Sequence, residues 1–329
     1  MSLRACLLLA SVFLAAPGTA DAQYLPECTV TMGDINFSVV NNVGQGDVQV
    51  SGPMHVDCRR GFPYARALVC IGLENPGDVG WDPRTLSGPA GRRLEYNIYA
   101  DPTHRQVWGS ARSPGATQVG VTVQLSLYGT ATANVLYYAK LRGAQNNARA
   151  GDYSRQFSDR DVSVSAVTYY GGGEYVCTPD MQVISRFSFT VRARVVPDCA
   201  IEATNLDFGI ADASLAAVPR DATSTITATC TQGSSYSIAL DRGRGTGATV
   251  AQRRLSRIDS GIDTLIYQLY SDPLRRRLWG DGSFGTSDVS GTGNGVQDAI
   301  VHTVYGRLNA QEPGRSGTYS DSITATITY

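Results

Sequence analysis

Apolar and polar residues alternate along many short stretches of this chain. The alternation is clear in residues 119–127, 187–195 and 322–329, where every second side chain is apolar. A period of two places one row of side chains on a core and the other row in water, as in a β-strand. Turn residues separate such runs, for example the glycines of 291–295 and the pair Asp101-Pro102. The pattern therefore predicts an all-β protein.

An internal repeat organises the chain. One block recurs 171 positions later, with Cys28, Ile35 and Phe37 matched by Cys199, Leu206 and Phe208. Residues 94–102 recur as 265–273 at the same offset, and both blocks then reach a Trp-Gly pair. Residues 145–154 recur as 311–320 at an offset of 166. Because each copy holds several short alternating runs, we expect two immunoglobulin-like β-sandwich domains.

The N-terminus has the pattern of a secretory signal. Arg4 precedes an apolar run over 7–16, and a small-x-small pattern ends at Ala22. We therefore expect a signal peptide at 1–22, a first domain at 23–196 and a second domain at 197–329. The formal net charge of −1 and the 17% of charged residues argue against a nucleic-acid partner.

The cysteines fit an exported protein. Apart from Cys6 in the predicted signal, the cysteines number six, and an even number in an exported chain indicates disulfides. The repeat limits their pairing. It implies Cys28–Cys58 and Cys199–Cys230, which leaves Cys70–Cys177 within the first copy.

The sequence offers no pattern for catalysis. Its three histidines, His55, His104 and His302, lack the spacing and partners of a nucleophile triad or a metal site. We expect no catalytic residue, no metal site and no cofactor, and therefore a protein that is not an enzyme.

Three segments resemble a known family. They are the opening at 28–37, the Tyr-x-Ile-Tyr-x-Asp-Pro block at 96–102 and the ending at 317–329. Together they are similar to the spore coat protein U domain, which builds the subunits of archaic chaperone–usher pili. The two-copy layout is similar to that of the tip adhesins of such pili.

This resemblance implies a function and partners. It implies a pilus tip subunit that mediates attachment and biofilm formation, exported through the periplasm to the cell surface. The implied partners are a periplasmic chaperone, an outer-membrane usher, a neighbouring pilin that donates a strand to 197–329, and an abiotic or host surface. The alternative is a structural protein of a spore coat or extracellular matrix.

The end of each copy suggests how its sandwich is completed. In the first copy the run with Phe187, Phe189, Val191, Ala193 and Val195 on one face predicts a strand that closes the domain from within the chain. The second copy ends on its last alternating run, so we expect an incomplete sandwich. Only residues 23–27 separate the predicted signal from Cys28, so we expect a subunit that accepts a donor strand but gives none.

Apolar clusters near turn residues are candidates for adhesive loops. They occur only in the first copy and comprise Phe62, Pro63, Tyr64, Leu136, Tyr137, Tyr138, Tyr169 and Tyr170. Exposed apolar loops would gain free energy when contact with a surface buries them. Core strands are the alternative interpretation of 135–138 and 169–170.

Overall fold

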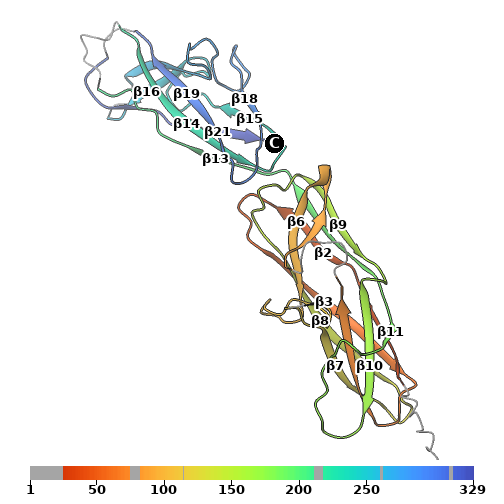
Figure 1. Ribbon diagram of the computed structural model, residues 1–329. Coiled ribbons are helices and arrows are strands. Elements are labelled where there is room, and N and C mark those ends of the chain that lie inside the picture. The colour runs from red at the N-terminus through yellow and green to blue at the C-terminus, as the bar shows by residue number, and fades with distance from the viewer. Residues whose placement is uncertain (1–24, 75–81, 114, 211–217, 260–261, 311–313) are drawn as a thin grey trace, which may run out of the picture.

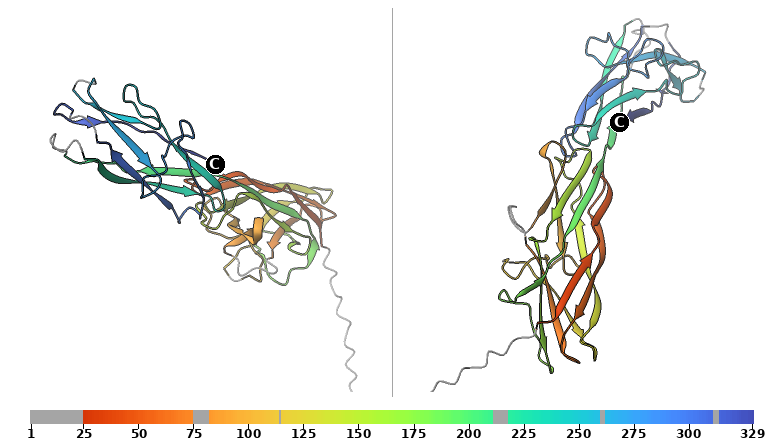
Figure 2. Two further views of the ribbon diagram at one scale, coloured as in Figure 1. Left: turned by 90° about the horizontal axis from the view of Figure 1, so that it is seen from above. Right: turned by 90° about the vertical axis from the view of Figure 1, so that its right-hand side faces the viewer.

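The computed structural model describes residues 25–74, 82–113, 115–210, 218–259, 262–310 and 314–329. The signal peptide predicted at 1–22 lies outside these residues. The described residues form two β-sandwiches that lie end to end (Figures 1 and 2). The fold is all-β, as the alternation predicts, and the described residues include a short 3₁₀ turn at Pro89–Gly91.

The first sandwich packs an eight-stranded sheet against a four-stranded sheet. In spatial order the larger sheet contains β1 (Glu27–Met32), β3 (Val48–Arg59), β8 (Ala131–Leu141), β6 (Arg93–Tyr99), β5 (Arg84–Ser87), β9 (Gly151–Phe157), β12 (Phe189–Val196) and β2 (Ile35–Asn41). The smaller sheet contains β11 (Val183–Ser185), β10 (Val162–Tyr169), β4 (Arg66–Leu73) and β7 (Val119–Gln124). The alternating apolar faces of the two sheets meet in one continuous core.

The second sandwich repeats this plan with fewer described strands. Its larger sheet contains β13 (Cys199–Ala203), β14 (Arg220–Cys230), β19 (Ile300–Leu308), β17 (Thr264–Tyr270), β16 (Arg253–Arg257) and β20 (Tyr319–Ser320). Its smaller sheet contains β18 (Val289–Thr292), β15 (Ser235–Leu240) and β21 (Ala325–Thr328). Comparison of the strand orders shows that the described part of the second sheet stops at β20, whereas the first continues from β9 to β12 and β2.

Each core contains a buried tryptophan, and the two tryptophans occupy equivalent positions in the repeat. Trp108 and Trp279 are both 0% exposed, and each donates its indole N–H to a strand carbonyl of the smaller sheet. Each tryptophan carbonyl accepts a hydrogen bond from a buried guanidinium, from Arg84 at 2.6 Å and from Arg253 at 3.0 Å. The alternation pattern does not identify these two arginines, since an Arg beside an alternating run is normally solvent-exposed.

The two sandwiches touch through loops beside the connection from β12 to β13. Asn146 of the first sandwich donates its amide to Asp298 of the second at 2.9 Å and accepts the backbone N–H of Gln297 at 2.9 Å. Arg149 forms an isolated bridge with Gln232. Only Pro197 and Asp198 lie between the last residue of β12 and the first of β13.

Candidate functional site

β12 completes the first sandwich from within the chain. It pairs antiparallel with β9 on one side and parallel with β2 on the other. Its inward side chains are deeply buried: Phe189 is 3% exposed, Val191 0%, Ala193 4% and Val195 1%. Each large side chain buried in this way stabilises the fold by about 1.5–3 kcal/mol, as an upper value. Phe187 precedes the strand and packs half-buried against the same core.

The outward face of β12 is polar, as the alternation requires. Arg192 pairs with Asp34 at 2.9 Å, and Arg194 lies 3.8 Å from Asp152. All four side chains are well exposed, so these ion pairs add little to stability. The apolar face is therefore the part that holds β12 in place.

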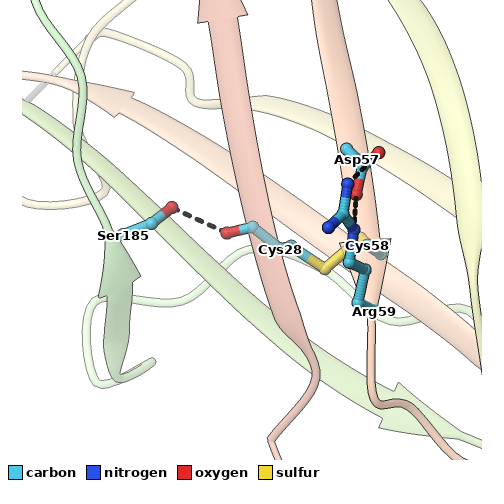
Figure 3. The surroundings of a disulfide bond; sticks show 5 residues. All are labelled: Cys28, Asp57, Cys58, Arg59 and Ser185. Carbon is cyan, nitrogen blue, oxygen red and sulfur yellow. Dashed lines mark hydrogen bonds and ion pairs between the residues drawn. A yellow bond between two sulfur atoms is a disulfide. The ribbon is translucent and has the colours of Figure 1, made fainter.

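The three disulfides join the cysteines in the pairs that the repeat implies. Cys28–Cys58 and Cys199–Cys230 each link directly opposite residues of neighbouring strands. Cys70–Cys177 instead joins β4 to the segment that leads from β10 to β12. Further along that segment, the Ser185 hydroxyl donates to the Cys28 carbonyl at 2.7 Å (Figure 3). The segment thus runs from the smaller sheet across to the larger one before β12 begins.

An open groove of about 1120 Å³ lies in the second sandwich. One wall is the segment 203–210 and the other is the segment 314–323. The floor is formed by side chains of the surrounding strands, namely Ile226, Leu240, Leu255, Leu265, Tyr267, Leu269, Val304 and Leu308. The floor is therefore largely apolar, and the groove runs between two stretches of backbone.

The walls of this groove are the counterparts of the strands that flank β12. Leu206 and Phe208 correspond to Ile35 and Phe37 of β2, and 317–320 corresponds to 151–154 of β9. Ile35 and Phe37 are 0% and 2% exposed, whereas Leu206 and Phe208 are only half-buried. The groove is thus the position that β12 fills in the first sandwich.

The backbone of 204–210 agrees with an empty strand position. In the first sandwich β2 pairs with β12 and with no other described strand. Residues 204–210 of the second sandwich have no strand assignment. Since a β-strand needs a partner for its ladder of hydrogen bonds, the missing strand assignment agrees with a groove that holds no described strand.

A polar contact joins the floor of the groove to the wall 314–323. The Tyr267 hydroxyl donates to the Asp321 carboxylate at 2.8 Å. Burial, together with this hydrogen bond and the negative charge, raises the pKa of Tyr267 well above its ordinary value. The phenol therefore stays neutral and keeps the bond at physiological pH.

Three aromatic loops meet at the end of the first sandwich that lies away from the second (Figure 1). The loop 60–65 contacts the turn 125–130 through the hydrogen bond from Gly61 N–H to the Gly129 carbonyl. The Tyr170 hydroxyl donates to the Pro63 carbonyl at 3.2 Å, and the Tyr170 and Phe62 rings lie 6.5 Å apart. These contacts join the loops into one aromatic loop cluster.

The predicted loop residues divide into two groups. Phe62, Tyr64 and Tyr170 are exposed by 43%, 63% and 64% within the aromatic loop cluster, beside Pro63. The turn 125–130 adds Leu127 and Tyr128, the latter 85% exposed, which are not among the predicted loop residues. Gly129 is a turn signal that could have identified them.

The placement of the remaining predicted residues in exposed loops is wrong. Leu136, Tyr137 and Tyr138 lie inside β8, because their backbone pairs with β3. Tyr137 is 6% exposed and covers Gly52, which has no side chain to exclude the ring. Tyr169 is the last residue of β10, 8% exposed and stacked on Tyr175 at 4.2 Å.

The described residues show no group of three or more His, Cys, Asp or Glu side chains that could hold a metal ion. His302 accepts or donates a 2.8 Å hydrogen bond with Tyr236, and burial lowers its pKa. His55 contacts Asn134, and His104 packs on Tyr99. Within the described ranges, no helix is long and apolar enough to cross a membrane.

The comparison with protein families gives the chain its family. The model of the Spore Coat Protein U domain matches twice, over residues 14–157 and 185–326. The chain belongs to this family. The second match includes β12 (Phe189–Val196), although β12 packs in the first sandwich. No curated protein matches the sequence.

A solved structure supports the fold. A chain from the CsuC–CsuE complex of chaperone and tip adhesion subunit, from the archaic chaperone–usher Csu pili of Acinetobacter baumannii, is 14% identical with a TM-score of 0.52. The match covers 92% of this chain and 100% of that one. The CupB6 tip adhesin of Pseudomonas aeruginosa is 10% identical with a TM-score of 0.36, over 93% and 96% of the two chains. The second similarity is too weak to carry an argument.

Proposed function

We propose that this chain is a non-enzymatic tip subunit of a chaperone–usher pilus, which attaches the cell to a surface and supports biofilm formation. The observation that carries the proposal is the contrast between the two copies. Equivalent walls enclose β12 in the first sandwich and an open groove in the second. The first domain is thus complete in itself, while the second has room for a strand from another chain.

The groove defines the chemistry of its partner. An occupant has to run antiparallel to β20 and parallel to 204–210, as β12 runs relative to β9 and β2. It must carry an alternating row of apolar side chains, because the floor is apolar. The N-terminal strand of a neighbouring pilin has this chemistry. Before assembly, a periplasmic chaperone would cover the same groove. At the outer-membrane usher, the strand of the neighbouring pilin would replace the chaperone.

The aromatic loop cluster supplies the contact with the surface. Its exposed aromatic and proline side chains come from three loops at the end opposite to the groove-bearing domain. Aromatic rings can adsorb on apolar material without any specific ligand, since contact removes their surface from water. An abiotic or host surface with apolar patches is therefore the proposed target.

The proposal is tested by labelling the protein on intact fibres. Cells that carry the cognate chaperone and usher genes are stained with gold-conjugated antibody against the first domain. We expect label at fibre ends, since the first domain needs no donor strand. Label along the whole shaft would contradict a tip position. Label on a coat or matrix without fibres would favour the structural alternative.

A further inference from the structure

The disulfide Cys70–Cys177 connects two elements that mechanical load on a tip adhesin must cross. Tyr64, in the aromatic loop cluster, lies six residue steps before Cys70. On the other side of the bridge, Cys177 leads through β11 to β12, and two residues later the second sandwich begins. The covalent route from the loop 60–65 to the second domain through this bridge is therefore short.

We propose that Cys70–Cys177 is a load-bearing bypass, which carries tension from the loop 60–65 of the aromatic loop cluster to β12 and spares the core between the two cysteines. The direction of the load rests on the proposed function, in which the loops hold a surface and the second domain is held in a fibre. The bypass itself is a property of the chain. The bridge encloses a sequence separation of 107, which tension cannot extend while the bridge is intact.

The repeat shows that this bridge is an addition to the copy that has its own closing strand. The equivalent tryptophans donate to the carbonyls of Ile71 and Ile238, which aligns β4 with β15. Cys70 therefore corresponds to Ser237 in the second copy. The domain with the open groove has the within-sheet bridge Cys199–Cys230 and no counterpart of the bypass among its described residues.

The surroundings of the bridge cover its two sulfurs unequally. Cys70 is 0% exposed and belongs to a separate apolar cluster with Leu68 and Tyr169, against which Met181 packs. Cys177 is half-buried beside the same cluster. The bridge is therefore deeply covered at Cys70 and partly covered at Cys177.

The geometry of β12 suits the end of such a path. Its Phe189 end pairs with Phe157, whereas its Val195 end pairs with Gly151, close to the joint with the second sandwich. Tension between the two ends of the molecule pulls β12 along its own axis. Since β12 is paired on both sides, the hydrogen bonds of two ladders must break together before the strand slides out.

Single-molecule stretching of the full chain tests the bypass. Azide-bearing residues replace Tyr64, 63% exposed, and Glu202, also exposed, and serve as attachment points for the handles. The path through the bridge has six residue steps from Tyr64 to Cys70 and 25 from Cys177 to Glu202. The path along the main chain from Tyr64 to Glu202 has 138 steps. At the reach of an extended chain, we expect the distance between the two attachment points to reach at most about 110 Å in the wild type and about 480 Å in a chain without the bridge.

The variants are Cys70→Ser with Cys177→Ser, and as a control Cys28→Ser with Cys58→Ser, whose bridge lies outside the path. The control should keep the short extension. If the first variant does not fold, a reductant added to wild-type molecules held under load should convert the short extension into the long one. A wild-type molecule that extends beyond about 110 Å with its bridge intact would overturn the proposal. A bridge-free chain that extends no further than this distance would also overturn it. Neither stretching measurement depends on attachment or fibre assembly. A failure of the bypass proposal can therefore be distinguished from a failure of the proposed function.

Discussion

The rings of Phe189 and Trp108 lie 6.3 Å apart with their planes only 4° from parallel. The contact joins the first residue of β12 to the central tryptophan of the first core. The ring of Phe157 also stacks on that of Phe189, with ring centroids 4.8 Å apart. In the second copy the equivalent Trp279 faces His302 at 6.4 Å. The closing strand is therefore part of the aromatic core of the first domain.

Charges placed on the inner face of β12 should destabilise the first domain. We expect Phe189→Asp or Val191→Asp to lower the free energy of unfolding by at least about 3 kcal/mol, since each removes apolar packing and buries a carboxylate. The first-domain melting transition of the full chain should fall by at least about 6 °C in calorimetry. Arg194→Ala, on the exposed face, is the control and should shift it little. Equal melting of all three variants would show that β12 does not complete the core.

A charge in the groove should prevent assembly and leave the second domain folded. Leu308 lies on the groove floor and is half-buried, whereas its counterpart Leu141, in the core of the first sandwich, is 0% exposed. We expect Leu308→Asp to abolish incorporation into fibres, because a docked apolar strand would bury the carboxylate. Ile258→Asp, at a site 67% exposed outside the groove, should assemble normally. Immunoblots of sheared fibres measure both, and fibres with normal amounts of the Leu308 variant would exclude the groove as the docking site.

Removal of the exposed rings should weaken attachment without affecting assembly. We expect the triple variant Tyr64→Ser, Tyr128→Ser and Tyr170→Ser to reduce binding of fibres to polystyrene at least about tenfold, since about 1.4 kcal/mol of lost contact free energy corresponds to that factor. Leu274→Ser with Phe284→Ser removes exposed apolar side chains from the second domain and serves as the control. Attachment that is equal in both variants would show that the aromatic loop cluster is not the adhesive surface.

Stability should decline in alkaline solution. Burial raises the pKa of Tyr96, and also that of Tyr267, above the ordinary tyrosine value of 10.0. In the unfolded chain these phenols ionise near that value, so the stability that their neutral burial contributes is present below about pH 10 and is lost as the pH rises further. Burial also lowers the pKa of Arg84 to about 10 and lowers the pKa values of Arg155 and Arg253, which has the opposite sign. The tyrosines whose pKa burial raises outnumber these arginines.

Melting temperatures measured between pH 8 and pH 11 check this expectation. They should decrease above about pH 10, and Tyr267→Phe should flatten the decrease of the second-domain transition. Tyr128→Phe, which changes an exposed phenol, should leave the profile unchanged. A melting temperature that rises through this range would mean that the arginine shift dominates.

Local pattern was enough to predict the architecture. Alternation depends on neighbouring residues alone, so the all-β class and the apolar face of 187–195 could be predicted directly. The repeat carried the cysteine positions from one copy to the other and so indicated which cysteines pair. The contrast between a closed first copy and an open second copy also followed from comparing the two.

Long-range packing decided the rest. Tyr137 is covered because β8 pairs with β3, which sets its ring over Gly52, and no local pattern contains that register. Tyr128 joins Phe62 and Tyr170 only because three separate strands end at the same edge of the sandwich.

Arg84 and Arg253 are buried because tryptophan carbonyls in the folded core accept their N–H groups. A period of two tells which side chains share a face of a strand. The tertiary structure alone decides what that face meets, because strand pairing joins residues that are far apart in the chain.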